Sequence, residues 1–111
     1  MVQLKEVFQE INQALQQDAS GTNGLKAVYQ FDIHGEESGK YQLVLQEENS
    51  FAAEGEHEKP DCTLNIGTED FINMVNGNLN GTQAFMTGRL KISGNMGLAL
   101  KLQSILSSYK S

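Results

Sequence analysis

The spacing of apolar residues changes along the chain, and these changes limit the folds that it can adopt. Near the N-terminus the apolar residues recur every three or four positions, which predicts an amphipathic helix on Leu4, Val7, Phe8, Ile11 and Leu15. From residue 25 the period becomes two, because apolar and polar side chains alternate over residues 25–33 and 41–45. The sequence therefore predicts a helix packed against a sheet.

Segments of turn-forming residues divide the alternating region into strands. They lie at residues 18–24, 34–40, 47–49 and 55–60. Between them the alternation predicts a short third strand over 50–54 and a fourth strand on Cys62, Leu64 and Ile66. Because the connections are short, we expect an antiparallel meander with one buried face and one solvated face.

After the fourth strand the period becomes helical again. Thr68 can cap a helix that ends at Asn76-Gly77. The remaining elements are expected to be a short helix over 82–87, a strand over 89–93 and a final helix over 96–109. In this last helix the apolar residues cover more than the stripe of about 100° that packing on a sheet requires.

The order of these elements indicates the α+β class. We expect a five-stranded, mostly antiparallel sheet that helices cover on one face. At 111 residues the chain has the size of one domain, which we expect to span residues 1–111. The sequence shows no internal repeat and no linker that would divide it.

Charge is distributed unevenly along the chain, whose formal net charge is −6. Residues 1–70 hold all 14 carboxylates and four lysines, a balance of −10, whereas residues 71–111 hold four cations and no carboxylate, a balance of +4. The acidic part disfavours nucleic acid as a partner, because nucleic-acid binding depends on Lys and Arg that neutralise phosphates. The cationic part fits either transient contact with an anionic membrane surface or an ordinary solvated face.

Residue types that support catalysis or metal binding form no recognisable motif. Cys62 is the only cysteine, so an internal disulfide is excluded, and its alternation with Leu64 predicts that it points into the core. His57 lies in an acidic loop whose spacing matches no zinc pattern. A nucleophile and base formed by Cys62 with His34 or His57 would need a contact that the spacing does not indicate. We expect no enzymatic activity, no metal ion and no cofactor.

The sequence also bears on cellular location. No apolar segment approaches the ~18 residues that a membrane-spanning helix requires. The first residues lack the apolar core of a signal peptide, and residues 108–111 do not match a peroxisomal signal of the Ser-Lys-Leu type. These features predict a cytoplasmic protein.

The last third of the chain indicates a function in binding. It holds Met74, Met86 and Met96 together with the Leu-rich final helix. Methionine is flexible and unbranched, so it fills irregular spaces and recurs at adaptable binding surfaces. This composition favours an adaptable cavity for an apolar molecule, although each of these residues taken singly can also belong to an ordinary core.

A series of short motifs runs through this region. They are Asp61-Cys62-Thr63-Leu64, Asp70-Phe71, Asn76-Gly77, Ala84-Phe85-Met86-Thr87-Gly88 and Leu90-Lys91-Ile92-Ser93-Gly94-Asn95. Together with the Leu-rich helix that follows, they resemble the signature of the sterol carrier protein 2 family. The resemblance covers essentially the whole chain in the order of its elements and is sharpest over residues 61–106.

The resemblance implies a function as a non-catalytic carrier of lipids. It implies an apolar tunnel between sheet and helices that binds fatty acid, fatty acyl-CoA or sterol-like ligands with low specificity. The tunnel-wall candidates are Phe71, Met74, Val75, Phe85, Met86, Ile92, Met96, Leu98, Leu102 and Leu106. We expect the final helix to act as a movable lid and the protein to be a monomer or a weak dimer. The alternative is an interaction module whose apolar face docks a partner enzyme or a second copy of the chain.

Overall fold

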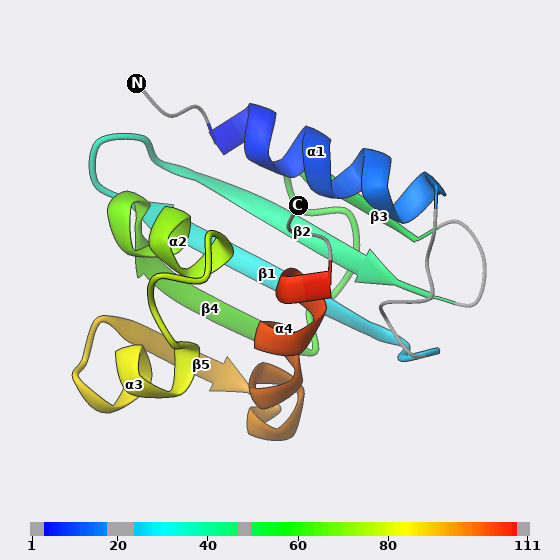
Figure 1. The fold of residues 1–111 in the computed structure, drawn as a ribbon. Helices are drawn as coiled ribbons and strands as arrows, with labels where there is room; N and C mark the ends of the chain where they lie inside the picture. The colour runs from blue at the N-terminus through cyan, green and yellow to red at the C-terminus, as the bar shows by residue number, and fades with distance from the viewer. Residues whose placement is uncertain (1–3, 18–23, 47–49, 109–111) are drawn as a thin grey trace.

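The computed structural model describes residues 4–17, 24–46 and 50–108, which form one sheet with helices on a single face (Figure 1). The strands are β1 (Ala27–His34), β2 (Gly39–Leu45), β3 (Phe51–Glu54), β4 (Cys62–Gly67) and β5 (Leu90–Gly94). The helices are α1 (Leu4–Gln17), α2 (Thr68–Val75), α3 (Gly81–Met86) and α4 (Met96–Ser108). The predicted α+β class and five-stranded sheet are confirmed. Most of the predicted turn at 18–24, the turn at 47–49 and the predicted helix end at Tyr109 lie outside the described residues.

The position of β4 differs from the expected meander. The strand order is β3-β2-β1-β4-β5, so β4 lies beside β1 and not beside β3. β4 runs parallel to β1, with Cys62 opposite Tyr29, while the other pairs of neighbouring strands are antiparallel. The meander prediction is wrong here because alternation reports the face that a side chain occupies and carries no information about the neighbouring strand. The sheet is nevertheless mostly antiparallel, as predicted.

Residues 55–61 connect β3 to β4 across the face of the sheet that the helices leave open. The buried amide of Gln42 in β2 holds this connection, since its Oε1 accepts hydrogen bonds from the backbone N–H groups of His57 at 2.9 Å and Glu58 at 3.0 Å. Its Nε2 donates to the Glu58 carbonyl at 2.8 Å and to Gln30 Oε1 at 3.0 Å. Every donor and acceptor position of the amide is therefore used, which makes its burial compatible with a stable fold.

An aromatic cluster forms the centre of the core between α1, α2 and the sheet. Phe8 stacks on Tyr41 with ring centroids 4.3 Å apart and on Phe71 at 5.3 Å, and it meets Phe31 edge-on at 5.5 Å. Such aromatic pairs add ~0.5–1.5 kcal/mol each to the free energy gained from burial. The predicted apolar face of α1 is confirmed, because its buried residues are Leu4, Phe8, Ile11 and Leu15.

The start of α2 differs from the prediction that Thr68 caps this helix. Gly67 is the N-cap residue and Thr68 is the first residue of the helix. The Thr68 hydroxyl accepts a hydrogen bond from the Glu37 N–H at 3.1 Å and lies 3.0 Å from the His34 carbonyl oxygen, so it joins α2 to the β1–β2 loop. The predicted end of the helix is confirmed by Asn76 as C-cap and Gly77 with a φ of +81°.

Candidate functional site

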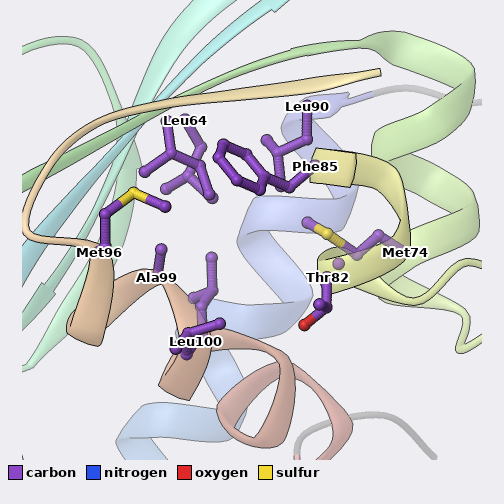
Figure 2. A pocket seen from close by; sticks show the side chains of 11 residues that line it. Leu64, Met74, Thr82, Phe85, Leu90, Met96, Ala99 and Leu100 are labelled. Carbon is purple, nitrogen blue, oxygen red and sulfur yellow. The ribbon is translucent and has the colours of Figure 1, made fainter. Parts of the chain in front are cut away.

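An apolar pocket lies between the sheet and the helices α2, α3 and α4 (Figure 2). Its floor consists of Leu64 from β4 with Leu90 and Ile92 from β5, which share one face of the sheet through their pairing register. The walls come from α2, α3 and α4 and consist of Met74, Gly81, Thr82, Phe85, Met96, Ala99, Leu100 and Leu102. Three helices and two strands therefore enclose one apolar compartment.

The chemistry of the lining is almost uniform. Among the described residues that line the pocket, Thr82 is the only one with a polar side chain, and none is charged. Figure 2 shows the Phe85 ring near the floor residues, with Met74 and Met96 on opposite sides of the pocket. Because thioether side chains adapt readily to new shapes, these walls suit an apolar ligand held by packing and not by a polar anchor.

The free space in this pocket is small. It measures about 40 Å³, whereas pockets that hold drug-sized ligands enclose about 300–1,000 Å³. The open tunnel implied by the family resemblance is therefore not seen among the described residues in this conformation. Phe85 is 41% exposed and Leu100 63% exposed, so these two side chains can change position without unpacking the buried core.

The structure brings together part of the predicted tunnel wall. The predicted residues that line the pocket are Met74, Phe85, Ile92, Met96 and Leu102. Phe71 and Leu106 are buried in the core outside the pocket, and Val75 and Leu98 are partly buried against that core. Met86 is 79% exposed and does not line the pocket. Contact of any of these side chains with a ligand remains a prediction.

Several lining residues were missed by reasoning from the sequence. They are Leu64, Gly81, Thr82, Leu90, Ala99 and Leu100. The alternation of β4 and β5 marks Leu64 and Leu90 as inward-facing, so a signal for them was present. Thr82 carries no comparable signal, because only the tertiary arrangement brings the first turn of α3 to the pocket.

The N-terminus of α4 is fixed firmly to the sheet. Asn95 caps the helix, since its Oδ1 accepts the Leu98 N–H at 3.1 Å, and its own N–H donates to the Asp61 carbonyl oxygen at 3.0 Å. At Gly94, where φ is +94°, a Cβ atom would lie 2.5 Å from that carbonyl oxygen. The Tyr29 hydroxyl donates to the Leu98 carbonyl oxygen at 2.6 Å. The wall of the pocket that α4 provides is thus held at its start by Tyr29 of β1 and by Asp61, the residue before β4.

Cys62 and His57 lie in environments that do not favour catalysis. Cys62 is 1% exposed, and burial raises the pKa of its thiol to about 11, so the reactive thiolate is scarce at neutral pH. His57 lies on the opposite face of the sheet, where its Nε2 is 2.8 Å from the Glu54 carbonyl oxygen. Within residues 4–17, 24–46 and 50–108, no three His, Cys, Asp or Glu residues are grouped so that they could hold a metal ion.

Comparison with known families gives a clear assignment. The model of the SCP-2 sterol transfer family matches residues 8–107 of this chain. The chain belongs to the SCP-2 sterol transfer family. The resemblance found in the short motifs is confirmed. In the described part of this family member, no helix is long and apolar enough to cross a membrane.

Curated relatives of this SCP-2 chain are longer proteins. Hydroxysteroid dehydrogenase-like protein 2 of Xenopus laevis is 40% identical over 104 residues, which cover 93% of this chain and 24% of that protein. The Homo sapiens protein of the same name is 34% identical over 105 residues, which cover 94% of this chain and 25% of that protein. The chain therefore spans about a quarter of the length of these relatives.

Solved structures of the family share the fold. Sterol carrier protein 2 from Yarrowia lipolytica in its apo form has a TM-score of 0.82 at 22% identity, covering 95% of this chain and 90% of that one. The sterol carrier protein domain 2 of Helicoverpa armigera has a TM-score of 0.76 at 29% identity, covering 94% of this chain and 85% of that one. Sterol carrier protein 2 of Aedes aegypti in complex with palmitate has a TM-score of 0.75 at 21% identity, covering 96% and 98%.

Proposed function

We propose that the chain is a non-catalytic lipid carrier that binds a fatty acid, a fatty acyl-CoA or a sterol-like molecule in the pocket between α3, α4 and the sheet. The observation that carries this proposal is the lining, which is apolar throughout except for Thr82. Membership of the SCP-2 sterol transfer family and the palmitate complex of the Aedes aegypti protein support the same class of ligand.

The energetics of an apolar pocket favour a carrier over a storage protein. Burial is worth ~0.8 kcal/mol per methylene, so a chain of about sixteen carbons gains on the order of 12 kcal/mol relative to water. A bilayer offers nearly the same transfer free energy, so the protein gains little affinity over the membrane. Its contribution is then kinetic, because it shields the lipid during passage through water. Specificity is low, since an apolar wall discriminates weakly between chains that differ by one methylene.

Ligand entry requires the pocket to expand, and its two flanking helices are held unequally. α4, the predicted lid, buries Leu102, Ile105 and Leu106 and is capped by Asn95. Within α3 only Ala84 is buried, although Asn80 caps its N-terminus by accepting the Thr82 N–H at 2.8 Å. Opening is therefore least costly where α3 carries Phe85 outward. Hydrogen exchange with and without palmitate tests this, because α3 amides should gain more protection than α4 amides if α3 is the moving wall.

Native mass spectrometry and displacement of a fluorescent fatty acid test the carrier function directly. The purified chain is expected to retain lipid and to bind the probe. Ala99→Phe fills the pocket from its α4 wall and should weaken probe affinity at least about tenfold, because a phenyl ring occupies space the ligand needs. Asn65→Phe places the same ring at an exposed position of β4, on the face of the sheet opposite the pocket residue Leu64, and should leave affinity unchanged. Equal affinity for the two variants would contradict the proposed pocket.

A second candidate is an interaction module that docks a partner enzyme. The observation that favours it is the length of the relatives, which are named for a dehydrogenase and of which this chain spans only about a quarter. Under this function the apolar side chains around the pocket pack against protein. A purified chain that carries no lipid, binds no fatty-acid probe and forms a stable complex with itself or with the remainder of such a relative would favour this candidate.

A further inference from the structure

Exposed apolar side chains gather beside the mouth of the pocket. Phe85 and Met86 of α3 are 41% and 79% exposed, and Met96 and Leu100 of α4 are 41% and 63% exposed. Within the described ranges, these four are the exposed large apolar side chains. These four residues are termed the mouth patch below. Figure 1 shows α3 and the start of α4 near the same edge of the sheet, which β5 forms.

Cations flank the mouth patch. Arg89 directly follows the turn that ends α3, and Lys101 is next to Leu100 on α4; both are exposed. Lys91, also exposed, lies between Leu90 and Ile92 on the edge strand β5, so its side chain points to the opposite face of the sheet and does not border the patch. The sequence from residue 71 onward contains no carboxylate, so α3, β5 and α4 contribute no negative side chain to this region. The mouth patch is therefore an apolar surface with one cation, Arg89 or Lys101, beside each of its two helices.

We propose that the mouth patch docks on an anionic lipid bilayer, so that the pocket opens toward the membrane. This inference rests on the proposed carrier function and adds where the carrier contacts its donor and acceptor. Apolar side chains between cations suit the boundary between headgroups and acyl chains, and Lys and Arg are attracted to anionic headgroups. The remainder of the chain, residues 1–70, carries a balance of −10 and is repelled by such a surface. The opposite charges of residues 1–70 and 71–111 thus orient the molecule with the mouth patch toward the bilayer.

Two other surfaces or partners fit less well. The apolar residues of α1 are buried in the core, and its exposed face carries Glu6 and Glu10, which an anionic surface repels, while its one cation, Lys5, is paired with Glu54 at 3.5 Å. A second copy joined through the same patch would bring the two sets of Arg89 and Lys101 together, and like charges across an interface are unfavourable. An anionic bilayer satisfies both the apolar and the charged components of the patch.

Vesicle binding tests the docking surface. Sedimentation with vesicles of phosphatidylcholine and phosphatidylserine should show binding that falls strongly for vesicles of phosphatidylcholine alone. The double variant Arg89→Glu/Lys101→Glu should reduce the partition coefficient at least about 25-fold, because each lost cation alone is worth about fivefold. Met86→Ser should reduce it about fivefold, since Met86 is the most exposed residue of the patch and does not line the pocket.

Matched controls separate this inference from the carrier function. Lys59→Glu reverses one charge in the segment that crosses the opposite face of the sheet, as each single patch substitution does, and should bind vesicles as the unmodified chain does. Uptake of a fluorescent fatty acid from solution should be unchanged in the Arg89 and Lys101 variant, which alters no lining residue. If the unmodified chain binds vesicles as expected but takes up no fatty acid, the proposed carrier function is refuted and the docking surface is not. The docking surface would be overturned if vesicle binding did not depend on phosphatidylserine or was unchanged in the patch variants. It would also be overturned if the chain formed a dimer that Met86→Ser dissociates.

Discussion

The Tyr29 hydroxyl donates a hydrogen bond of 2.6 Å to the carbonyl oxygen of Leu98, and so it joins the central strand β1 to the first turn of α4. Tyr29 is fully buried, and burial raises the pKa of its hydroxyl above the usual range. The hydroxyl therefore remains a neutral donor at physiological pH. Since α4 forms one wall of the apolar pocket, this bond couples the core to the mobility of that wall.

Tyr29→Phe removes this donor and keeps the buried ring. We expect the free energy of unfolding to fall by about 1 kcal/mol, because a single hydrogen bond is lost. We also expect faster exchange of a bound fluorescent fatty acid, since the first turn of α4 loses its tie to β1. Stopped-flow release measures the second effect. Tyr41→Phe is the control, because Tyr41 is also buried in the core, where its ring stacks on Phe8 of α1. Equal release rates would contradict the coupling.

Stability at alkaline pH should depend on Cys62. Burial raises the pKa of its thiol from 9.0 to about 11, so the folded state holds the proton more tightly than the unfolded state. The resulting stabilisation is complete below about pH 9 and is lost as the pH rises toward about 11, a loss of up to about 3 kcal/mol. Tyr29, whose pKa is also raised, adds to the loss at the upper end of this range.

Cys62→Ala tests this assignment by urea unfolding at a series of alkaline pH values. The variant should be less stable at neutral pH, because it leaves a small cavity. Its stability should nevertheless fall less steeply between about pH 9 and about pH 10 than that of the unmodified chain, because the thiol no longer titrates. Parallel slopes for the two proteins would show that other groups account for the alkaline loss.

Much of the fold follows from local sequence pattern, because burial acts directly on apolar spacing. The helical spacing of Leu4, Phe8, Ile11 and Leu15 predicts the face of α1 that is buried. The place of β4 could not be predicted in this way. It depends on a connection whose path Gln42 fixes through hydrogen bonds to His57 and Glu58, and a buried Gln in an alternating strand looks like any solvent-facing residue.

The candidate site was only partly predictable for a related reason. Apolar character places Met74, Phe71 and Leu106 equally well in a core or in a binding wall. Which of them borders free space depends on where the helices leave a gap, and the stacking of Phe71 on Phe8 assigns it to the core. Thr82 reaches the pocket through the placement of α3, which no periodicity reports.

Gly94→Ala should destabilise the protein more than an ordinary glycine substitution does. Its φ of +94° is strained for alanine, and the new Cβ would lie 2.5 Å from the Asp61 carbonyl oxygen. We expect a loss of at least about 2 kcal/mol in the free energy of unfolding. Gly88→Ala is the control, because its φ is +82° but nothing lies within 4 Å of the new Cβ; the expected loss is about 1 kcal/mol. Equal losses in chemical denaturation would exclude the close approach as a cause.

Gln42→Leu should disrupt the connection between β3 and β4. The substitution leaves the N–H groups of His57 and Glu58 without their acceptor, at a cost of about 2–3 kcal/mol in the free energy of unfolding. Asn65→Leu makes a similar change at an exposed position of β4 and should alter stability by less than about 0.5 kcal/mol. Chemical denaturation compares the two, and hydrogen exchange at His57 and Glu58 should accelerate only in the Gln42 variant.

Phe85→Ala tests whether the wall of the pocket must move before a ligand enters. The Phe85 ring occupies space near the pocket floor (Figure 2), and it is 41% exposed. Removing it should lower the free energy of unfolding by less than the about 3–5 kcal/mol typical of a buried Phe. It should also speed fatty-acid uptake, because a cavity then exists before the ligand arrives. Met86→Ala on the same helix changes no lining residue and should leave the uptake rate unchanged. If Phe85→Ala slows uptake from solution, the ring contacts the ligand and does not block its entry.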